Sequence, residues 1–359
     1  MATAGNITEE STADRTSRAP LPWLFSAELD LSAFLGSALV SVLLLLIGFP
    51  LGLIDSETPD GLWIALVLMI DVAHVYSTGF RVYFDRAEVG RRPWLYTLTP
   101  ISAYVIGVML FSIGPQLYWR CLAYLAVFHF VRQQYGWVAL YRSKENDRSM
   151  FGWWIDSAAI YSATLYPLIY WHAHLPRSFA WFMSVDFVSI PAWTAEVALA
   201  IYGVSLSLYT LRSGYRAWFG GRPNPGKDIV VFTTAFLWYI GIITFDSDYA
   251  FTVTNVVAHG VPYMILVLWV RDRTHHKSSD GRSMRWLRCL ALIWILAYLE
   301  EFFWDVGVWH DRPWLFGEPL QSAGWRTVLT PILAVPQITH YVLDGFIWKR
   351  QARVETMEA

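Results

Sequence analysis

The sequence predicts an all-α fold, a polytopic transmembrane bundle of about ten helices, from three observations. The first is composition: 55% of the 359 residues are hydrophobic and only 16% are charged, whereas soluble domains carry roughly 25% charged residues. The second is a series of apolar runs that each approach the roughly 20 residues a helix needs to cross a bilayer. The third is an alternation between loops that are rich in Lys and Arg and loops that are poor in them.

The apolar runs define the predicted spans. They are 32–54, 61–80, 94–113, 118–140, 153–171, 190–211, 229–245, 249–270, 286–304 and 327–348. Because backbone N–H and C=O groups find no water inside lipid, each run is expected to be a helix.

The polar ends of the chain complete the predicted domain organisation. A polar tail covers 1–31, a single transmembrane helical domain covers 32–350, and a short C-terminal tail covers 351–359. The first 22 residues contain no apolar core, which argues against a cleavable signal peptide.

Basic residues concentrate in every second loop and in the C-terminal tail. They are Arg81, Arg86, Arg91, Arg92; Arg142, Lys144, Arg148; Arg212, Arg216, Arg222, Lys227; Arg271, Arg273, Lys277, Arg282, Arg285, Arg288; and Lys349, Arg350, Arg353. The remaining loops carry at most two basic residues each. Since loops rich in Lys and Arg stay in the cytoplasm, both termini are predicted to be cytoplasmic, with the chain in the inner, cytoplasmic membrane.

Overall charge and cysteine content exclude several classes of protein. The formal net charge is −2, so the chain has no basic field to attract nucleic acid. Only two cysteines occur, Cys121 and Cys289, too few for a disulfide framework or a cysteine-ligated cluster. The expected partners are the lipid bilayer and a lipophilic small molecule, and the sequence leaves the oligomeric state open.

Four of the nine histidines fall inside predicted spans. These are His74, His129, His259 and His340. Their four spans all run from the outside to the cytoplasm, and each histidine lies about 10 to 20 Å of helix from the basic loop that follows. A matched depth on four helices predicts that the imidazoles converge on one metal site. The other histidines lie in or beside loops and need no such explanation.

Each of these histidines has a polar companion three or four residues away, on the same helix face. The companions are Asp71, Gln133, Asn255 and Asp344. Such groups can orient metal-bound imidazoles or complete the coordination. The alternative is that the same side chains form only hydrogen bonds between helices. A further acidic group, Glu300, Glu301 and Asp305, is expected to carry outer-surface charges far from the histidines in depth.

Imidazoles with carboxylates suit iron, copper or zinc, and we expect non-haem iron. A site below the inner membrane surface would meet a substrate dissolved in the bilayer, such as a lipid, a fatty chain, an isoprenoid or a carotenoid. The sequence therefore predicts a metal-dependent membrane oxidoreductase or oxygenase, without assigning a catalytic residue beyond the metal ligands.

Two other functions use the same residues. Intramembrane His and Asp also mark transporters and proton relays. Two of the four histidines could instead be axial ligands of a haem in an electron-transfer protein.

Two segments carry a partial family resemblance. The segments HFVRQQYGW at 129–137 and THYVLDGFIWKR at 339–350 resemble the histidine-bearing helices of the Brp/Blh-type membrane carotene dioxygenases. The resemblance implies an iron held by histidines of several helices, with His129 and His340 matched by motif, and His74 and His259 by topology. The paired histidines of one family helix correspond here to His129 and Gln133.

Overall fold

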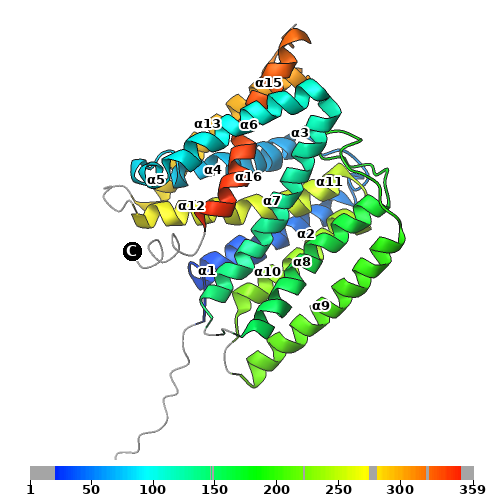
Figure 1. The fold of residues 1–359 in the computed structure, drawn as a ribbon. Helices are drawn as coiled ribbons and strands as arrows, with labels where there is room; N and C mark the ends of the chain where they lie inside the picture. Colours follow the sequence, from blue (N-terminus) through cyan, green and yellow to red (C-terminus); the bar gives the residue numbers. More distant parts are fainter. Residues whose placement is uncertain are drawn as a thin grey trace, which may run out of the picture.

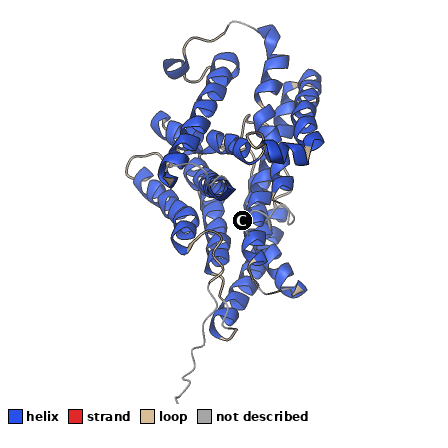
Figure 2. Cartoon of the chain, turned by 90° about the vertical axis from the view of Figure 1, so that its left-hand side faces the viewer, coloured by secondary structure: helices blue, strands red, loops and turns tan. Residues whose placement is uncertain are grey.

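The computed structural model describes residues 21–145, 147, 149–220, 223–274, 281–320 and 323–348. Within these ranges the chain forms helices and loops, with no strand (Figure 2). Six of the described helical segments are long and apolar enough to cross a membrane: Ala27–Gly48, Asp60–Arg81, Pro93–Ile113, Trp193–Trp218, Pro225–Thr244 and Asp248–Arg273. The structure is therefore a helical bundle with the length and composition of a membrane protein.

The helical elements follow one another along the chain. They are α1 (Ala27–Asp30), η1 (Leu31–Gly36), α2 (Ser37–Gly48), α3 (Asp60–Leu62), η2 (Trp63–Val72), α4 (Ala73–Arg81), α5 (Arg86–Arg91), α6 (Pro93–Ile113), α7 (Pro115–Ser143), α8 (Met150–Ala173), α9 (Trp193–Trp218), α10 (Pro225–Trp238), η3 (Tyr239–Thr244), α11 (Asp248–Phe251), η4 (Thr252–Val256), α12 (Val257–Thr274), α13 (Arg282–Trp304), η5 (Asp305–Trp309), α14 (Pro313–Phe316), η6 (Ala323–Trp325), α15 (Arg326–Leu333) and α16 (Val335–Ile347).

The elements pack as two adjoining groups that meet along α7 and α12 (Figure 1). In one group α7, α8 and α10 contact one another and α9 covers α8. In the other, α16 contacts α4, α6 and α7, while α12 packs against α4 and α2. Most residues of α12 are buried, so this helix runs through the centre of the bundle.

The predicted span 327–348 is wrong as a single helix. The structure breaks it at Ala334 into α15 and α16, which are 8 and 13 residues long. Neither reaches the roughly 20 residues of a full span. Pro336 lies at the start of α16, where its missing N–H leaves no helical hydrogen bond unmade. The break allows α16 to approach α7 independently of α15.

The predicted polar tail 1–31 also ends too late, because helix begins at Ala27. Asp30 is buried and accepts hydrogen bonds from the backbone N–H groups of Leu24, at 2.6 Å, and Phe25, at 2.9 Å. The Tyr141 hydroxyl donates to the same carboxylate at 2.7 Å. Residues 21–31 are thus tied to the end of α7, whereas 1–20 and the tail 351–359 lie outside the described residues.

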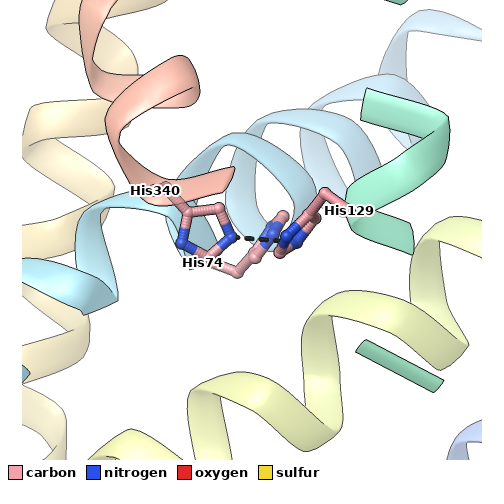
Figure 3. Close-up of side chains that lie close together, drawn as sticks. All are labelled: His74, His129 and His340. Atoms are coloured by element: carbon pink, nitrogen blue, oxygen red, sulfur yellow. Dashed lines mark hydrogen bonds between the residues drawn. The ribbon is translucent and has the colours of Figure 1, made fainter. Parts of the chain in front are cut away.

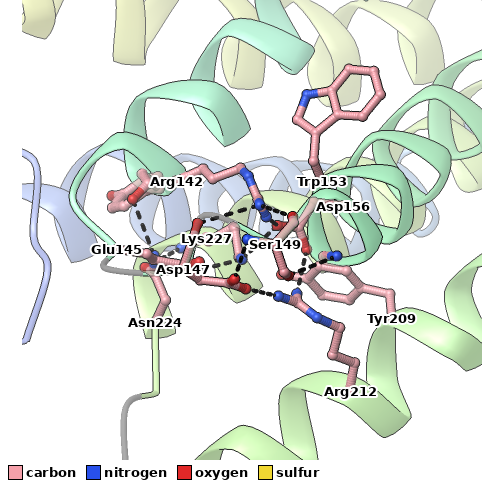
Figure 4. A network of polar contacts seen from close by, with 12 residues as sticks. Arg142, Glu145, Asp147, Ser149, Trp153, Asp156, Tyr209, Arg212, Asn224 and Lys227 are labelled. Atoms are coloured by element: carbon pink, nitrogen blue, oxygen red, sulfur yellow. Dashed lines mark hydrogen bonds and ion pairs between the residues drawn. The ribbon is translucent and has the colours of Figure 1, made fainter.

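A buried ionic network joins α7, α8, α9 and α10 at one end of the bundle (Figure 4). The Asp156 carboxylate on α8 accepts from Arg142 at 2.6 Å, from Arg212 at 2.9 Å and from Lys227 at 2.9 Å. The Glu145 carboxylate pairs with Lys227 at 2.7 Å. Three cations from three other helices therefore share one aspartate that is 1% exposed, and Lys227 and Arg212 also pair with Glu145 and Asp147.

We expect Asp156→Asn to lower the free energy of unfolding by roughly 3 kcal/mol or more, because three partly or fully buried cations lose their shared counter-charge. Thermal unfolding of the purified protein in detergent measures this. The matched control is Asp60→Asn, since Asp60 is half-exposed and pairs with Arg312 at 3.4 Å, an arrangement worth at most about 1 kcal/mol. Equal stability of the two variants would contradict the assigned role of Asp156.

Candidate metal centre

The four intramembrane histidines come from four helices and meet in the centre of the bundle. His74 lies on α4, His129 on α7, His259 on α12 and His340 on α16. All four are at most 2% exposed. The convergence predicted from their matched depth is therefore present in the structure.

The Nε2 atoms of the histidines face one another. His74 Nε2 lies 3.2 Å from His259 Nε2, and His340 Nε2 lies 3.2 Å from His129 Nε2. Figure 3 shows the rings of His74, His129 and His340 gathered together, with the contact between His340 and His129 drawn as a dashed line. The ring centroids of His129 and His259 are 5.2 Å apart, so the two close pairs belong to one cluster.

A glycine allows α12 to come close enough to bring His259 to His74. Gly260 packs against Ile70 of η2, where an added Cβ would lie 2.6 Å from Ile70 Cγ2 and 3.3 Å from the Ile70 carbonyl oxygen. A larger residue would push α12 away from the helical segment that carries His74. Gly260, which follows His259 in the sequence, thus sets the distance between α12 and η2.

The Nδ1 atoms of three of the histidines face outward, toward polar groups. The Asp71 carboxylate lies 3.6 Å from His74 Nδ1, and the Asp344 carboxylate lies 3.8 Å from His129 Nδ1. Both distances are longer than hydrogen bonds. A carboxylate on this side favours the tautomer with a proton on Nδ1, which leaves the Nε2 lone pair directed into the cluster.

The partner of His340 was not predicted. Its Nδ1 lies 2.7 Å from Thr78 Oγ1, which in turn lies 3.2 Å from the Tyr263 hydroxyl. Thr78 is four residues after His74 on the same helix. Helical spacing places Thr78 on the face of His74, but its contact with His340 joins two helices and cannot be read from the sequence.

The four predicted companion residues divide into two kinds. Asp71 lies beside the histidine of its own helix, as expected, whereas Asp344 lies beside His129 of α7 and not beside His340 of its own helix. Gln133 donates to the His259 backbone carbonyl at 2.8 Å, and its side chain also contacts the imidazole of His129 on its own helix.

Asn255 bonds within its own helical segment. Its amide donates to Thr254 Oγ1 at 2.9 Å and contacts the Phe251 carbonyl oxygen at 3.5 Å. Among the described residues Asn255 makes no hydrogen bond to an imidazole, although the prediction placed it on the face of His259. Asp71, Asp344 and Gln133 are therefore the companions that lie against imidazole rings.

Aromatic rings stack on two of the four imidazoles. The Phe130 ring stacks on His259 with 3.6 Å between centroids and 6° between planes. The Tyr341 ring stacks on His129 at 4.8 Å and 28°. The sequence pattern did not single out Phe130, because a lone aromatic residue in a span is ordinarily packing. These walls fix the ring planes and keep water from the cluster.

The donor set and spacing fit a metal ion. One nitrogen each of His74, His129 and His340 lie within 4.8 Å of one another, and so do ligand atoms of Asp71, His74 and His259. Nitrogens bound to one ion at about 2.0–2.1 Å, at angles of roughly 90–110°, lie about 3.0–3.4 Å apart, and the two observed pairs are at 3.2 Å.

Several buried polar atoms around the cluster have no hydrogen-bond partner among the described residues. They include His74 Nδ1, His259 Nδ1, Asp71 Oδ1 and Asp344 Oδ1. An unpaired buried polar group costs about 1–3 kcal/mol. A cation among the imidazoles would offset part of this cost by attracting the two carboxylates toward the cluster.

The acidic group near the end of α13 is not the outer-surface patch that the sequence suggested. Glu300 is 5% exposed and Asp305 is 4% exposed. The Glu300 carboxylate accepts from Trp304 at 3.1 Å and from Gln337, one turn before His340, at 3.2 Å. Contact with α16 buries Glu300, and a hydropathy pattern along one helix does not report such a contact.

A cavity of about 950 Å³, which we call the α7–α16 pocket, reaches the cluster from one side. Residues of α7, α8, α12 and α16 line it, and they include His129, Tyr341 and Asp344. Phe128 and Leu165 also line it and are 58% and 42% exposed on the outer surface. The pocket therefore opens between helices, on an apolar face at the depth of the histidines.

The other histidines among the described residues and both cysteines take no part in the cluster. His172 contacts the Tyr124 hydroxyl at 3.2 Å, and His310 contacts Arg326 at 3.3 Å, while His275 and His276 lie outside the described residues. Cys121 is exposed and Cys289 is buried, and both are free. No protein-family model, curated protein or solved structure matches the chain.

Proposed function

We propose that the protein is a membrane-embedded non-haem metal oxygenase or related oxidoreductase, with iron as the favoured metal and a lipophilic molecule as substrate. The observation that carries the proposal is the meeting of four buried imidazoles, with their Nε2 atoms inward, beside an apolar pocket that opens at their depth. An iron ion held by imidazoles supplies the binding and activation of dioxygen, the oxidant of the proposed reaction.

The residues of the chain then have separate tasks. His74, His129, His259 and His340 hold the ion. Asp71 and Asp344 stabilise the proton on Nδ1 of the imidazoles beside them, and this makes each Nε2 a better ligand.

The side chains around the ion shape the side from which the substrate approaches. Phe130 stacks on His259 and Tyr341 stacks on His129. These contacts fix the orientation of both imidazole rings and exclude water. His129 is the histidine of the four that lines the α7–α16 pocket, so the substrate is expected to approach along its ring.

The two other functions fit the geometry less well. A haem would use two imidazoles as ligands and would leave the other two of the same buried cluster without a role. A transporter or proton relay would use the same His and Asp side chains, but it does not require the Nε2 atoms of four imidazoles to face one another.

The proposed location is the inner, cytoplasmic membrane with both termini in the cytoplasm. The support is the placement of the basic loops in the sequence. The histidine cluster would then lie in the cytoplasmic half of the bilayer.

Elemental analysis of the purified full-length protein tests the proposed function. We expect stoichiometric iron, no Soret band in the absorption spectrum, and loss of the iron after prolonged chelation under reducing conditions. Addition of ferrous iron to the stripped protein should restore the metal content. Protein that holds no metal after both aerobic and anaerobic preparation would overturn the oxygenase and make the proton relay the better function, and a Soret band would favour haem.

A further inference from the structure

Arg132 lies on the wall of the α7–α16 pocket, one helical turn after His129. It is exposed, about 16 Å of helix from the end of α7 at Ser143. The exposed neighbours that line the same opening are Phe128 and Leu165. A permanent positive charge therefore lies at an opening whose other exposed residues are apolar.

Two tyrosines hold the guanidinium at this opening. Arg132 Nη1 donates to the Tyr161 hydroxyl, and the guanidinium carbon lies 4.9 Å from the centroid of the Tyr135 ring. The Tyr135 and Tyr161 rings stack on each other at 5.0 Å. Neither tyrosine is an anion, so these contacts position the charge without neutralising it.

No carboxylate of the described residues lies within ion-pair distance of Arg132. Asp344 is the one carboxylate that lines the pocket, and it lies against His129 Nδ1 at 3.8 Å. An arginine at the centre of a membrane helix costs about 2.5–3.5 kcal/mol on insertion scales, and such residues ordinarily face a partner. The described residues thus leave the Arg132 guanidinium without an anionic partner.

We propose that the occupant of the α7–α16 pocket is a long-chain amphiphile whose anionic head group, a carboxylate or a phosphate, pairs with Arg132 while its apolar chain runs past His129. This inference rests on the proposed function, because it names the class of substrate on which the oxygenase would act. The planar guanidinium can donate two parallel hydrogen bonds to either head group.

The shape of the cavities agrees with a long chain. Leu125 and Val342 line both the α7–α16 pocket and a second, almost wholly apolar cavity of about 520 Å³ between α6, α7 and α16. The first cavity alone, at about 950 Å³, is at the upper end of the range of roughly 300–1,000 Å³ for small-molecule sites. A chain anchored at Arg132 therefore has further apolar space in the second cavity, beyond Leu125 and Val342.

Binding of three ligands that share one chain tests the inference: oleate, oleyl phosphate and oleyl alcohol, measured by calorimetry on the full-length protein in zwitterionic nanodiscs. We expect at least one of the two anions to bind about tenfold or more tightly than the alcohol, as one charge-assisted hydrogen bond implies. The preferred anion shows whether the head group is a carboxylate or a phosphate. Equal affinity of all three ligands would overturn the inference.

Substitutions then assign the preference to one side chain. Arg132→Gln should remove the advantage of the anion and leave the affinity for the alcohol unchanged, whereas Arg132→Lys should keep part of it. The matched control is Arg120→Gln on the same helix, since Arg120 lines neither cavity and donates to the Val185 carbonyl at 2.9 Å. An Arg132→Gln protein that still prefers the anion would refute the assignment.

The binding measurements do not require a bound metal, so failure of this inference can be told apart from failure of the proposed function. Anion binding that depends on Arg132, in a protein that holds no metal after both aerobic and anaerobic preparation, would retain the amphiphile site and overturn the oxygenase. Metal content and oxidation of apolar substrates without any dependence on the head group would retain the oxygenase and overturn the role of Arg132.

Discussion

Replacing His340 by alanine is expected to abolish metal binding and activity together. The variant loses one imidazole of the pair that meets at 3.2 Å, and loss of an outer partner of a ligand alone already lowers metal affinity by about 10–100-fold. We therefore expect a drop of more than about 100-fold in metal affinity and an equal loss of turnover. Elemental analysis and oxygen consumption on the same preparation measure the two effects.

The control for this substitution is the alanine substitution of a histidine that lies outside the cluster. His172→Ala removes a half-buried imidazole that contacts Tyr124 and the Leu168 carbonyl, away from the cluster, and should leave metal content unchanged. Insertion and yield of the His340→Ala protein should match the wild type, which excludes simple misfolding. A His340→Ala protein with full metal and full activity would place the metal site elsewhere.

Filling the α7–α16 pocket is expected to stop turnover while the metal stays bound. Gly136 lines the pocket, and a Cβ added there meets no atom within 4 Å. Gly136→Trp should therefore fit the helix and project into the pocket. We expect a loss of about 30-fold or more in activity, because excluding even ~80 Å² of apolar contact removes roughly 2 kcal/mol of substrate binding.

Two further variants separate occlusion from other effects. Gly136→Ala adds one methyl group and should keep nearly full activity. Gly203→Trp introduces the same indole on the exposed surface of α9, where an added Cβ also meets nothing within 4 Å, and should be neutral. Full activity of Gly136→Trp would show that the substrate reaches the histidines by another route, whereas loss of its metal would make the pocket part of the metal site.

The helical fold followed from local properties of the chain. Apolar length and low charge predict helices in lipid, because a segment without water must satisfy its own backbone groups. A position along the helix axis could also be predicted for each histidine. The rise per residue is fixed, so counting from a basic loop places His74 or His340 along the membrane normal without knowledge of any neighbour.

Contacts between helices were less predictable, as Asp344 and Glu300 illustrate. Helical spacing placed Asp344 on the face of His340, which is correct for one helix, but in the bundle that face turns the carboxylate toward His129 of α7. The same limitation made Glu300 look like a surface charge, although it accepts a hydrogen bond from Gln337. Periodicity gives a direction relative to a residue's own helix axis and carries no information on the next helix.

The sequence by itself therefore determined the class of fold and the shortage of sulfur ligands, and it singled out the four histidines that meet. Only the tertiary structure decided which nitrogens face one another, that Thr78 is the partner of His340, that the chain breaks at Ala334, and that a pocket with Arg132 on its wall leads to His129. The physical reason is that rotation and spacing of helices depend on how side chains of several segments interlock, as Gly260 against Ile70 shows. Such interlocking is a property of pairs of distant segments, whereas hydropathy and charge are properties of each segment alone.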